Sequence, residues 1–545
     1  MKILNVVFAV ILALSGCVHR KEVAGLESSK LTQKHVPVFI DRDNSGLVEI
    51  DLMVEEASED LQFERVDLII GKDGNPEILS SITLRHEVLS ASGEVESSIV
   101  IGGIDKVKHK SRLDTNTGLE AGHNRIVFDL KADSSALLGK SFSIESVRLL
   151  FKGGGHLVLN PERAFRFRPA LVLRATGQDD CDTYRIPGLV TTNSGTLIAV
   201  YDNRYNNSKD LQEDIDVGMS RSVDGGQTWE PMQVIMDMGE WGGRSQRLNG
   251  IGDPSVLYDH TTNTIWVAAL WISGSSPDNM LWWDSKPGML PEETGQFVLV
   301  KSTDDGRTWS EPINITEQIK DPEWQLLLAG PGRGITLDDG TLVFPAQFKK
   351  DIGTKAVDGG QYTCHSTIVY SQDGGDSWHI GTGARPNTTE AQVVQLADGG
   401  LMLNMRDDLN RHDKGDTNGR AVSVTYDMGQ TWEPHPSTNS ALIEPNCMAS
   451  LIAHDIEMEN QMQQVLFFSN PNSKTQRTNM TIKTSLDGGL SWPDNHQVEL
   501  FQPSGFGYSC MTMVDDEYVG IVYEGIKELY FQKVPVWELL GRPAL

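Results

Sequence analysis

The stretch SVDGGQTW begins at Ser222, and four related stretches follow it: STDDGRTW from Ser302, SQDGGDSW from Ser371, TYDMGQTW from Thr425 and SLDGGLSW from Ser485. Each copy has Ser or Thr first, Asp third, Gly fifth, Thr or Ser seventh and Trp last. The five Asp residues are separated by 80, 69, 54 and 60 positions. A short signature at this spacing indicates one turn that recurs in a larger structural repeat.

The residue types of this signature, the Asp box, predict a hairpin turn. Ser and Asp side chains bond to backbone amides a few residues on, and Gly supplies a positive φ. Trp packs between neighbouring sheets, where its N–H can meet a backbone carbonyl. A calcium loop is the alternative, but the hairpin already explains the residues. Roughly 60 residues per repeat suits a four-stranded propeller blade, so the region from about 172 to 545 predicts six blades.

The charge of the chain limits its partners. The 545 residues include 47 Lys and Arg and 75 Asp and Glu, which gives a net charge of −28. This balance argues against a nucleic-acid partner. An anionic ligand would need a local cluster of cations to overcome the overall field.

The N-terminus predicts export. Lys2 precedes a short apolar run of signal-peptide size, and Leu14-Ser15-Gly16-Cys17 resembles the bacterial lipobox, in which the Cys is acylated. We expect residues 1–17 to be a lipoprotein signal peptide, with Cys17 as the lipidation site and the protein anchored in the cell envelope. An ordinary signal peptide cut nearby is the alternative. Residues 18–34 are polar and charged, which predicts a tether.

Residues 35–170 predict a separate β-sandwich domain, because strand-like runs alternate with turns and no Asp box occurs there. The apolar positions 142, 144, 147, 149 and 151 keep a period of two with one slip, as a bulged strand would. The domain could bind glycans or act as a spacer. Residues 171–545 then form the propeller. Four further cysteines are far apart and are expected to be single buried thiols: Cys181, Cys364, Cys447 and Cys510.

One further motif indicates a resemblance of this chain to a known protein family. Tyr184-Arg185-Ile186-Pro187 is similar to the Arg-Ile-Pro motif that opens the catalytic domain of sialidases. Together with the Asp boxes, it makes residues 172–532 resemble a bacterial exo-α-sialidase (neuraminidase). The resemblance implies an all-β fold with a six-bladed propeller, and sialylated glycans as substrates.

Sialic acid carries a carboxylate on its anomeric carbon, and guanidinium groups pair with carboxylates in bidentate fashion. The family uses three Arg from distant blades. The matching positions are Arg185, Arg406 in Leu403-Asn404-Met405-Arg406, and Arg477 in FSNPNSKTQRTN. These residues would also supply the positive cluster that a chain of this net charge needs.

The resemblance assigns the nucleophile to Tyr508 and its base to Glu390. Sialidases are an exception among retaining glycosidases because they attack with Tyr. A carboxylate nucleophile would be repelled by the substrate's carboxylate. A phenol avoids this repulsion, but its pKa of about 10 requires a partner base.

The loop from Asp202 to Asp210 corresponds to the family's acid/base loop, and Asp210 is the predicted acid/base. Asp214 and Asp216 are competitors, although they enter the next strand-like run.

Secondary positions follow the same resemblance. Arg204 and Asp253 are predicted to bind the substrate, with a simple Asp-Pro turn as the alternative for Asp253. Glu524 is expected to orient the first Arg, since a buried guanidinium needs a counter-charge. Trp271, Trp282 and Trp283 could line the site of the leaving sugar or be core residues.

The implied reaction is double displacement with retention, and it requires no cofactor and no metal. Two alternatives stay open. An intramolecular trans-sialidase or transglycosylase would share every catalytic residue, and a non-catalytic sialoglycan-binding propeller would lack the Tyr, Glu or Asp.

Overall fold

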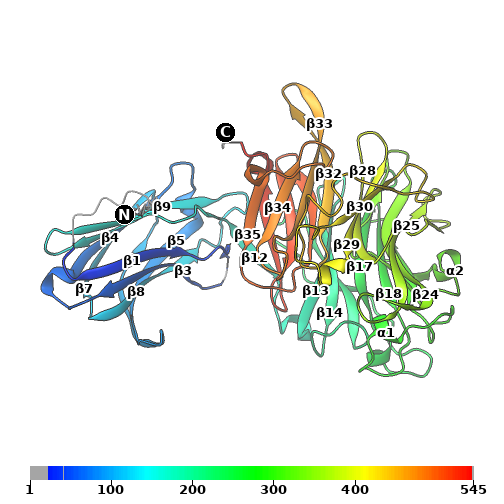
Figure 1. The fold of residues 1–545 in the computed structure, drawn as a ribbon, viewed down its shortest axis with the longest axis horizontal. Helices are drawn as coiled ribbons and strands as arrows, with labels where there is room; N and C mark the ends of the chain where they lie inside the picture. Colours follow the sequence, from blue (N-terminus) through cyan, green and yellow to red (C-terminus); the bar gives the residue numbers. More distant parts are fainter. Residues whose placement is uncertain (1–22, 41, 543–545) are drawn as a thin grey trace, which may run out of the picture. The chain divides into compact units, whose positions relative to one another are not determined.

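The structure, a computed structural model, describes residues 23–40 and 42–542. The chain is all-β (Figure 1), as the sequence predicted. Helices in the described residues are single turns: α1 (Leu281–Asp284), α2 (Thr316–Ile319), α3 (Val536–Leu539), and the 3₁₀ turns η1 (Glu59–Leu61), η2 (Pro76–Ile78), η3 (Gln178–Asp180), η4 (Gln246–Leu248), η5 (Asp408–Arg411) and η6 (Asp494–His496). None of these helices is long and apolar enough to cross a bilayer. Cys17 and the predicted signal peptide lie outside the described residues.

The chain divides into two compact units, of which the first comprises residues 23–34, 42–133 and 142–166. It contains two sheets. One has the strand order β1 (Leu26–Gln33), β3 (Asn44–Val54), β8 (Gly122–Ala132), β5 (Leu79–Leu89), β6 (Val95–Asp105). The other has the order β10 (His156–Leu159), β9 (Phe142–Phe151), β4 (Gln62–Ile70), β7 (Lys110–Gly118), and β11 (Arg166–Phe167) leads along the chain to the second unit.

The tether prediction for residues 18–34 is wrong where the structure describes strand β1. Residues 26–33 pair in antiparallel fashion with β3, from Leu26 opposite Val54 to Gln33 opposite Val48. Of this strand's side chains only Leu31 is buried. An edge strand held by backbone pairing can be almost entirely polar. Such a sequence has the composition of a linker, which is why the prediction failed.

The bulge predicted in strand β9 is confirmed. Residues 142, 144, 147, 149 and 151 are buried. The pairing with β4 shifts register where Ile69 faces Ser146 and Ile70 faces Ile144, so Glu145 is the extra residue. A one-residue insertion lets the apolar side chains return to the buried face.

The second unit comprises residues 35–40, 134–141 and 167–542, and it contains six sheets. The sheet that contains the first and last strands of this unit has the order β2 (Val38–Phe39), β12 (Pro169–Arg174), β38 (Leu529–Pro535), β37 (Tyr518–Glu524), β36 (Ser509–Asp515). The next two are β13 (Thr183–Thr191), β14 (Leu197–Arg204), β15 (Ile215–Ser222), β16 (Gln233–Met236), and β20 (Ile313–Asn314), β19 (Gln296–Ser302), β18 (Thr264–Trp271), β17 (Ile251–Asp259), β22 (Gly332–Arg333).

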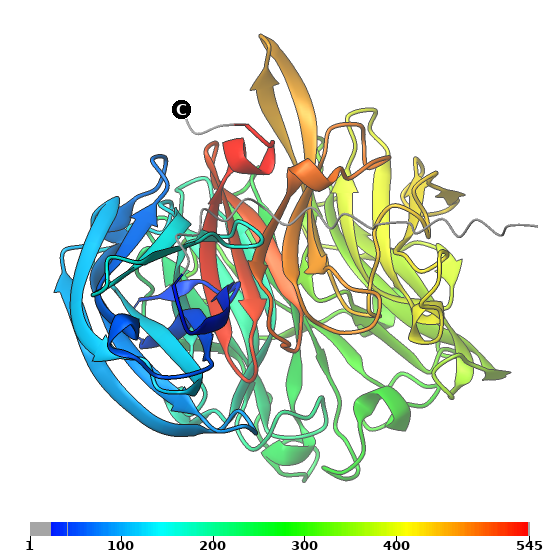
Figure 2. The same cartoon turned by 60° about the vertical axis from the view of Figure 1, so that its left-hand side comes forward.

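Three further sheets complete the unit. The fourth has the order β21 (Leu326–Ala329), β24 (Leu342–Lys355), β25 (Gln361–Ser371), β26 (His379–Ile380), with β23 (Ile335–Thr336) on β24 and β27 (Arg385–Pro386) on β25. The fifth is β28 (Thr388–Gln395), β29 (Leu401–Asp407), β30 (Ala421–Thr425), β31 (Glu433–Pro434). The sixth is β32 (Ser450–Met458), β33 (Gln461–Pro471), β34 (Met480–Ser485), β35 (Gln497–Phe501). Figure 2 shows these sheets following one another from green through yellow to orange.

Each Asp box lies in the hairpin between two neighbouring strands of a sheet, as predicted for a turn. In the first box, Asp224 accepts hydrogen bonds from the backbone and side chain of Thr228 at 2.9 and 2.6 Å. Gly226 has φ +86°, and a Cβ there would lie 2.1 Å from Phe531 of the preceding sheet. The box therefore both turns the chain and packs one sheet on another. The predicted bond from the Trp indole to a backbone carbonyl occurs in two boxes, at Trp432 and Trp492.

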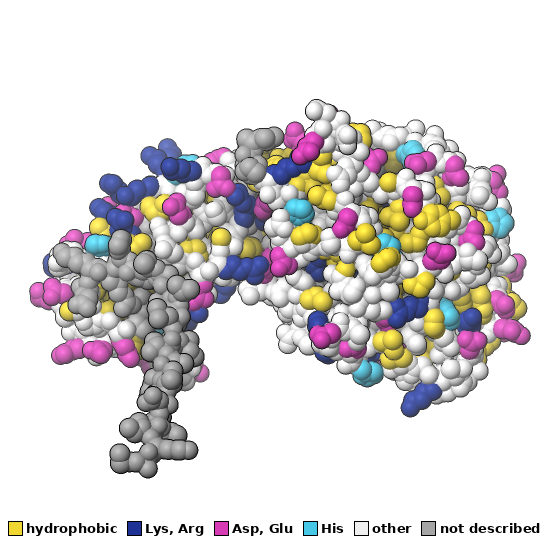
Figure 3. Space-filling model, turned by 45° about the horizontal axis from the view of Figure 1, so that its top comes forward, with side chains coloured by type: hydrophobic (Ala, Val, Ile, Leu, Met, Phe, Trp, Pro, Cys, Tyr) yellow, Lys and Arg dark blue, Asp and Glu magenta, His cyan; other side chains and the backbone are white. Residues whose placement is uncertain are grey.

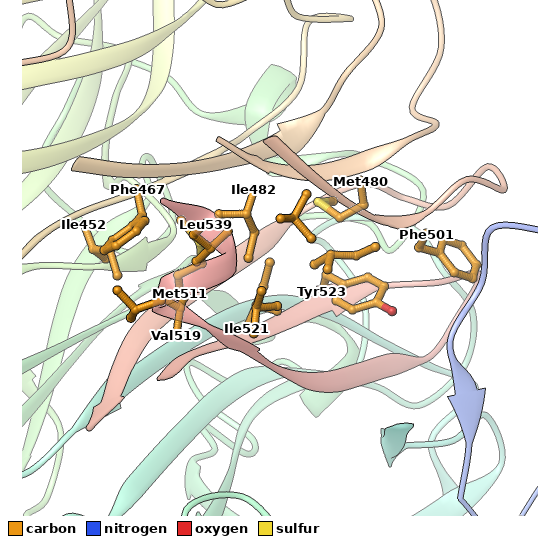
Figure 4. Close-up of a cluster of buried hydrophobic side chains, with 14 of the residues drawn as sticks. Ile452, Phe467, Met480, Ile482, Phe501, Met511, Val519, Ile521, Tyr523 and Leu539 are labelled. Atoms are coloured by element: carbon orange, nitrogen blue, oxygen red, sulfur yellow. The ribbon is translucent and has the colours of Figure 1, made fainter. Parts of the chain in front are cut away.

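Apolar cores fill the spaces between consecutive sheets of the second unit. Figure 4 shows the core in which β32–β35 pack on β36–β38, with Phe467, Ile482, Met511 and Ile521 pointing toward one another. Similar cores join the second sheet to the third, the third to the fourth, the fourth to the fifth and the fifth to the sixth. Strands β13, β17 and β28, each the first of its sheet along the chain, carry Arg185, Asp253 and Glu390.

Candidate active site

A cavity of about 290 Å³ contains the predicted catalytic residues. Its lining combines polar and apolar side chains: Ile186, Asp210, Leu211, Asp253, Leu270, Met280, Leu281, Trp282, Trp283, Leu328, Gln347, Thr389, Glu390, Arg406, Arg411 and Tyr508. Asp210 and Tyr508 lie more than 290 positions apart in the sequence, yet both line this cavity together with Glu390. Arg185, Arg204, Arg477 and Glu524 bond to residues of this lining or pack against them.

Backbone irregularities place several of these side chains. Strand β13 shifts register between Arg185 and Gly188. Strand β17 does so between Gly252 and Ser255, and Asp253 there has φ +54°. Strand β28 shifts between residues 388 and 391, next to Glu390. A bulge re-aims a side chain that regular pairing would direct elsewhere.

The hydroxyl of Tyr508 donates a short hydrogen bond to Oε1 of Glu390. Burial and the neighbouring carboxylate of Glu390 raise the pKa of Tyr508 above its ordinary value, so the phenol is neutral at rest. Burial alone would raise the pKa of Glu390, but Arg406 and the hydroxyl of Tyr508 outweigh it and the pKa is lowered. An ionised carboxylate therefore accepts from a neutral phenol, which is the arrangement of a base and its nucleophile.

Three guanidinium groups converge on Tyr508. Nη1 of Arg406 lies 3.2 Å from its hydroxyl oxygen and 2.6 Å from Oε2 of Glu390. The guanidinium carbons of Arg185 and Arg477 lie 5.0 and 5.5 Å from the centre of its ring. Figure 3 shows Asp and Glu side chains dispersed over one face of the molecule, whereas these guanidinium groups lie close together around one ring.

Glu524 links the first Arg to the nucleophile. Its Oε1 accepts from Nε of Arg185 at 3.1 Å and from the amide of Ile186 at 2.9 Å. Its Oε2 accepts from the amide of Tyr508 at 2.8 Å. The carboxylate is buried, so it provides both the counter-charge of a buried guanidinium and an acceptor for two backbone amides.

Asp210 lies between two arginines. Its Oδ1 accepts from Nη1 of Arg185 at 3.0 Å and from Nη1 of Arg204 at 2.8 Å. Partial burial acts to raise its pKa, but Arg204 and Arg185 hold the pKa at about 2. Asp210 is therefore ionised between these two guanidinium groups. The competitors Asp214 and Asp216 do not line the cavity, and burial together with Asp237 raises the pKa of Asp216 to about 7.

Asp253 faces the cavity, and its backbone amide donates to Oδ1 of Asp202 at 2.8 Å. Burial and the charge of Asp202 raise the pKa of Asp253. The other oxygen of Asp202 accepts from Arg204 at 2.8 and 3.1 Å. Asp202 thus fixes both predicted binding residues, a role that its position in the sequence did not disclose.

Asn446 is a second residue that sequence reasoning missed. Its Oδ1 accepts from Nη2 of Arg406 at 2.8 Å, and its carbonyl accepts from Nη2 of Arg477 at 3.3 Å. The residue is buried with φ +62°. An isolated Asn carries no sequence signal for holding two arginines that are 71 positions apart.

The three Trp residues have different surroundings. Trp271 is buried in the core between the second and third sheets. Trp282 is half-buried and Trp283 is 48% exposed, and both line the cavity. The cysteines Cys181, Cys364, Cys447 and Cys510 are buried free thiols, as expected.

Comparisons with known proteins agree with this site. Residues 186–496 match the BNR repeat-like domain family. A sialidase of Bacteroides fragilis (strain YCH46) is 41% identical over 534 residues, which cover 93% of this chain and 94% of that protein. The solved structure of the Hadza microbial sialidase Hz136 is 39% identical, with a TM-score of 0.81 over 93% of this chain and 99% of that one. The chain is thus a glycoside hydrolase, and it belongs to the family of sialidases with BNR-like repeats.

More distant relatives match in part. A sialidase of Micromonospora viridifaciens is 30% identical over 65% of this chain and 51% of its own length. An intramolecular trans-sialidase from Ruminococcus gnavus is 18% identical, with a TM-score of 0.53 over 68% of this chain and 98% of that one. That likeness is one of fold.

Proposed function

We propose that the chain is a retaining exo-α-sialidase that releases terminal sialic acid from sialylated glycans through a covalent Tyr508 intermediate. The supporting observation is the contact between Tyr508 and Glu390, surrounded by three guanidinium groups in one cavity. A nucleophile next to its base explains attack. The arginines suit a substrate that carries a carboxylate at the reacting carbon.

Substrate binding prepares the acid. In the structure Arg185 pairs with Asp210. A substrate carboxylate held by Arg185, Arg406 and Arg477 takes over this guanidinium and adds a negative charge nearby. Both changes raise the pKa of Asp210, which can then carry a proton to the leaving oxygen.

The reaction proceeds in two displacements. Glu390 takes the proton of Tyr508 as the phenolic oxygen bonds to the anomeric carbon. The glycosidic bond breaks, and the leaving oxygen receives the proton of Asp210. Asp210 then accepts a proton from water, whose oxygen attacks the anomeric carbon. The bond to Tyr508 breaks and the phenol regains a proton from Glu390. Two inversions give net retention.

A six-bladed β-propeller is the arrangement that we propose for the second unit. Each sheet packs on the next, and Phe531 of the first sheet packs on Trp229 beside the second. Strands β12 and β38 pair within one sheet and so join the two ends of the unit. For the first unit, in which strands of both sheets have alternately buried side chains, among them β3, β7 and β9, we propose a β-sandwich. We also propose that lipidation at Cys17 anchors the protein in the cell envelope after export.

Substitution of Tyr508 by Phe tests the proposal. We expect the wild-type chain to release sialic acid from a fluorogenic α-sialoside, and the variant to be slower by orders of magnitude. Tyr426→Phe is the matched control, because this tyrosine is exposed and pairs with Asp398 away from the cavity. Equal rates in Tyr508→Phe and wild type would refute the nucleophile assignment.

Two measurements test the intermediate and its fate. Incubation with 2,3-difluorosialic acid should leave a covalent adduct on the peptide that contains Tyr508, detected by mass spectrometry. Proton NMR of early products should show α-sialic acid. A β-anomer would exclude retention, and an anhydro sugar would assign the chain to the intramolecular trans-sialidases.

A further inference from the structure

Lys349 is a buried lysine that the proposed chemistry does not use. It lies on β24, and its side chain is fully enclosed. Burial lowers the pKa of Lys349 to about 7, while Cys364, Asp358 and Asp408 act in the other direction. Among the described residues, no carboxylate lies within ion-pair distance of its ammonium group. A cation buried in this way requires another form of stabilisation.

Three aromatic rings surround this ammonium group. Nζ lies 3.5 Å from the ring centre of Trp282, 4.0 Å from that of Tyr362 and 5.4 Å from that of Trp283. It also donates a hydrogen bond to the carbonyl of Trp282. Asp358 accepts from the indole of Trp282 at 3.1 Å and from the hydroxyl of Tyr362 at 2.5 Å. Cation–π attraction is strongest for a desolvated cation over Trp, so Lys349 holds the one-turn helix α1 against β24.

The helix α1 in turn supports the loop that carries Asp210. The amide of Leu281, the first residue of α1, donates to the carbonyl of Leu211 at 2.7 Å. The two leucines share an apolar cluster, against which Trp282 packs. In Figure 1, α1 lies beside β18 and β24. Continuous contacts therefore run from Lys349 through Trp282 and Leu281 to the residue after Asp210.

We propose that Lys349 is a positioning residue for acid catalysis. Its aromatic cage, formed by Trp282, Tyr362 and Trp283, holds α1 in place. The helix α1 in turn holds the loop that places Asp210 at the leaving oxygen. This inference rests on the proposed function. Misplacing a general acid slows the departure of poor leaving groups, because an alcohol leaves only as it is protonated. A phenol, whose pKa is about 10, leaves with far less assistance. Lys349 therefore matters more for natural glycans than for aryl sialosides.

Lys349→Met tests this role, since it keeps an unbranched side chain one atom shorter and removes the charge and the donor. The measurement is kcat/KM on two substrates, sialyllactose and 4-methylumbelliferyl sialoside. We expect the variant to lose about tenfold more activity on sialyllactose than on the aryl substrate, part of the 10²- to 10⁴-fold that a general acid contributes. Asp210→Asn should show the same selectivity with a larger ratio. Lys355→Met, an exposed position on the same strand, is the matched control and should change neither value.

Asp358→Asn is a milder variant that weakens the cage from its rim, and it replaces Lys349→Met if that variant does not fold. It should show the same preference for the aryl substrate at smaller size. Equal losses on both substrates, or no loss on either, would overturn the positioning role. A wild-type chain that hydrolyses neither substrate would instead refute the proposed function and remove the basis of this inference.

Discussion

Replacing Glu524 by Gln removes one charge and leaves the side-chain volume nearly unchanged. The substitution therefore isolates the electrostatic role of this carboxylate. Glu524 accepts three hydrogen bonds, from Arg185 and from the amides of Ile186 and Tyr508. A Gln amide has one acceptor oxygen, so whichever way it is oriented at least one donor faces its NH₂ group. Both the fold around the first Arg and the position of the nucleophile depend on these bonds.

The expected loss of stability is the sum of two contributions, a broken ion pair and a backbone amide left without an acceptor. Breaking a buried ion pair costs about 3 to 5 kcal/mol, and the lower end applies because Asp210 still pairs with Arg185. A buried amide without an acceptor adds about 1 to 3 kcal/mol. We therefore expect the free energy of unfolding to fall by about 4 kcal/mol. If half of this is expressed in the transition state, about 2 kcal/mol, kcat/KM falls about 30-fold.

Urea unfolding followed by tryptophan fluorescence measures the stability of the relevant unit, because all 12 Trp lie between positions 229 and 537. The matched control is Glu517→Gln, an exposed position in the turn before β37. Hydrolysis of the aryl sialoside gives the rate. A variant with the midpoint of wild type and less than a threefold loss in kcat/KM would refute the role that we assign to Glu524.

Two further predictions concern the base and the scaffold. Since the pKa of Glu390 lies below its ordinary 4.5, this base is ionised at every pH above that value. We therefore expect kcat/KM on the aryl substrate to stay level from pH 8 to 5 and to fall only below 4.5. An acid limb centred above pH 5 would contradict an ionised base. In the third Asp box, Gly374→Ala should cost about 1 kcal/mol of unfolding free energy, because φ is +71° but the space is open. Gly375→Ala should cost at least about 2 kcal/mol more, because the added Cβ would lie 2.4 Å from Trp266. Equal losses of unfolding free energy for the two variants in urea titrations would show that this contact relaxes freely.

Much of the fold could be predicted because its signals are local. The Asp boxes encode hairpins in eight residues each, and the period-two pattern of residues 142–151 encodes a bulged strand. Strand β1 was misread because an edge strand needs backbone pairing and almost no apolar side chains. Sequence patterns report side chains, so a polar edge strand resembles a linker.

The candidate site was predictable only in part, for the same reason. Arg185 stands in a motif, and Tyr508 and Glu390 match the family's residues. Asn446 and Lys349 stand in no motif, because their roles depend on partners from other strands. The link from Lys349 to Asp210 joins positions 139 residues apart, and no pattern within one segment can disclose it.

The sequence by itself determined the repeated hairpin, the all-β class and the residue types that suit a substrate with an anomeric carboxylate, since propensity, turn chemistry and charge act over a few residues. Only the tertiary structure decided which carboxylate is ionised, which lysine is caged and which bulged strands direct their side chains into the cavity. Those properties depend on burial and on charges that lie close in space, and packing of the six sheets, rather than order along the chain, sets both.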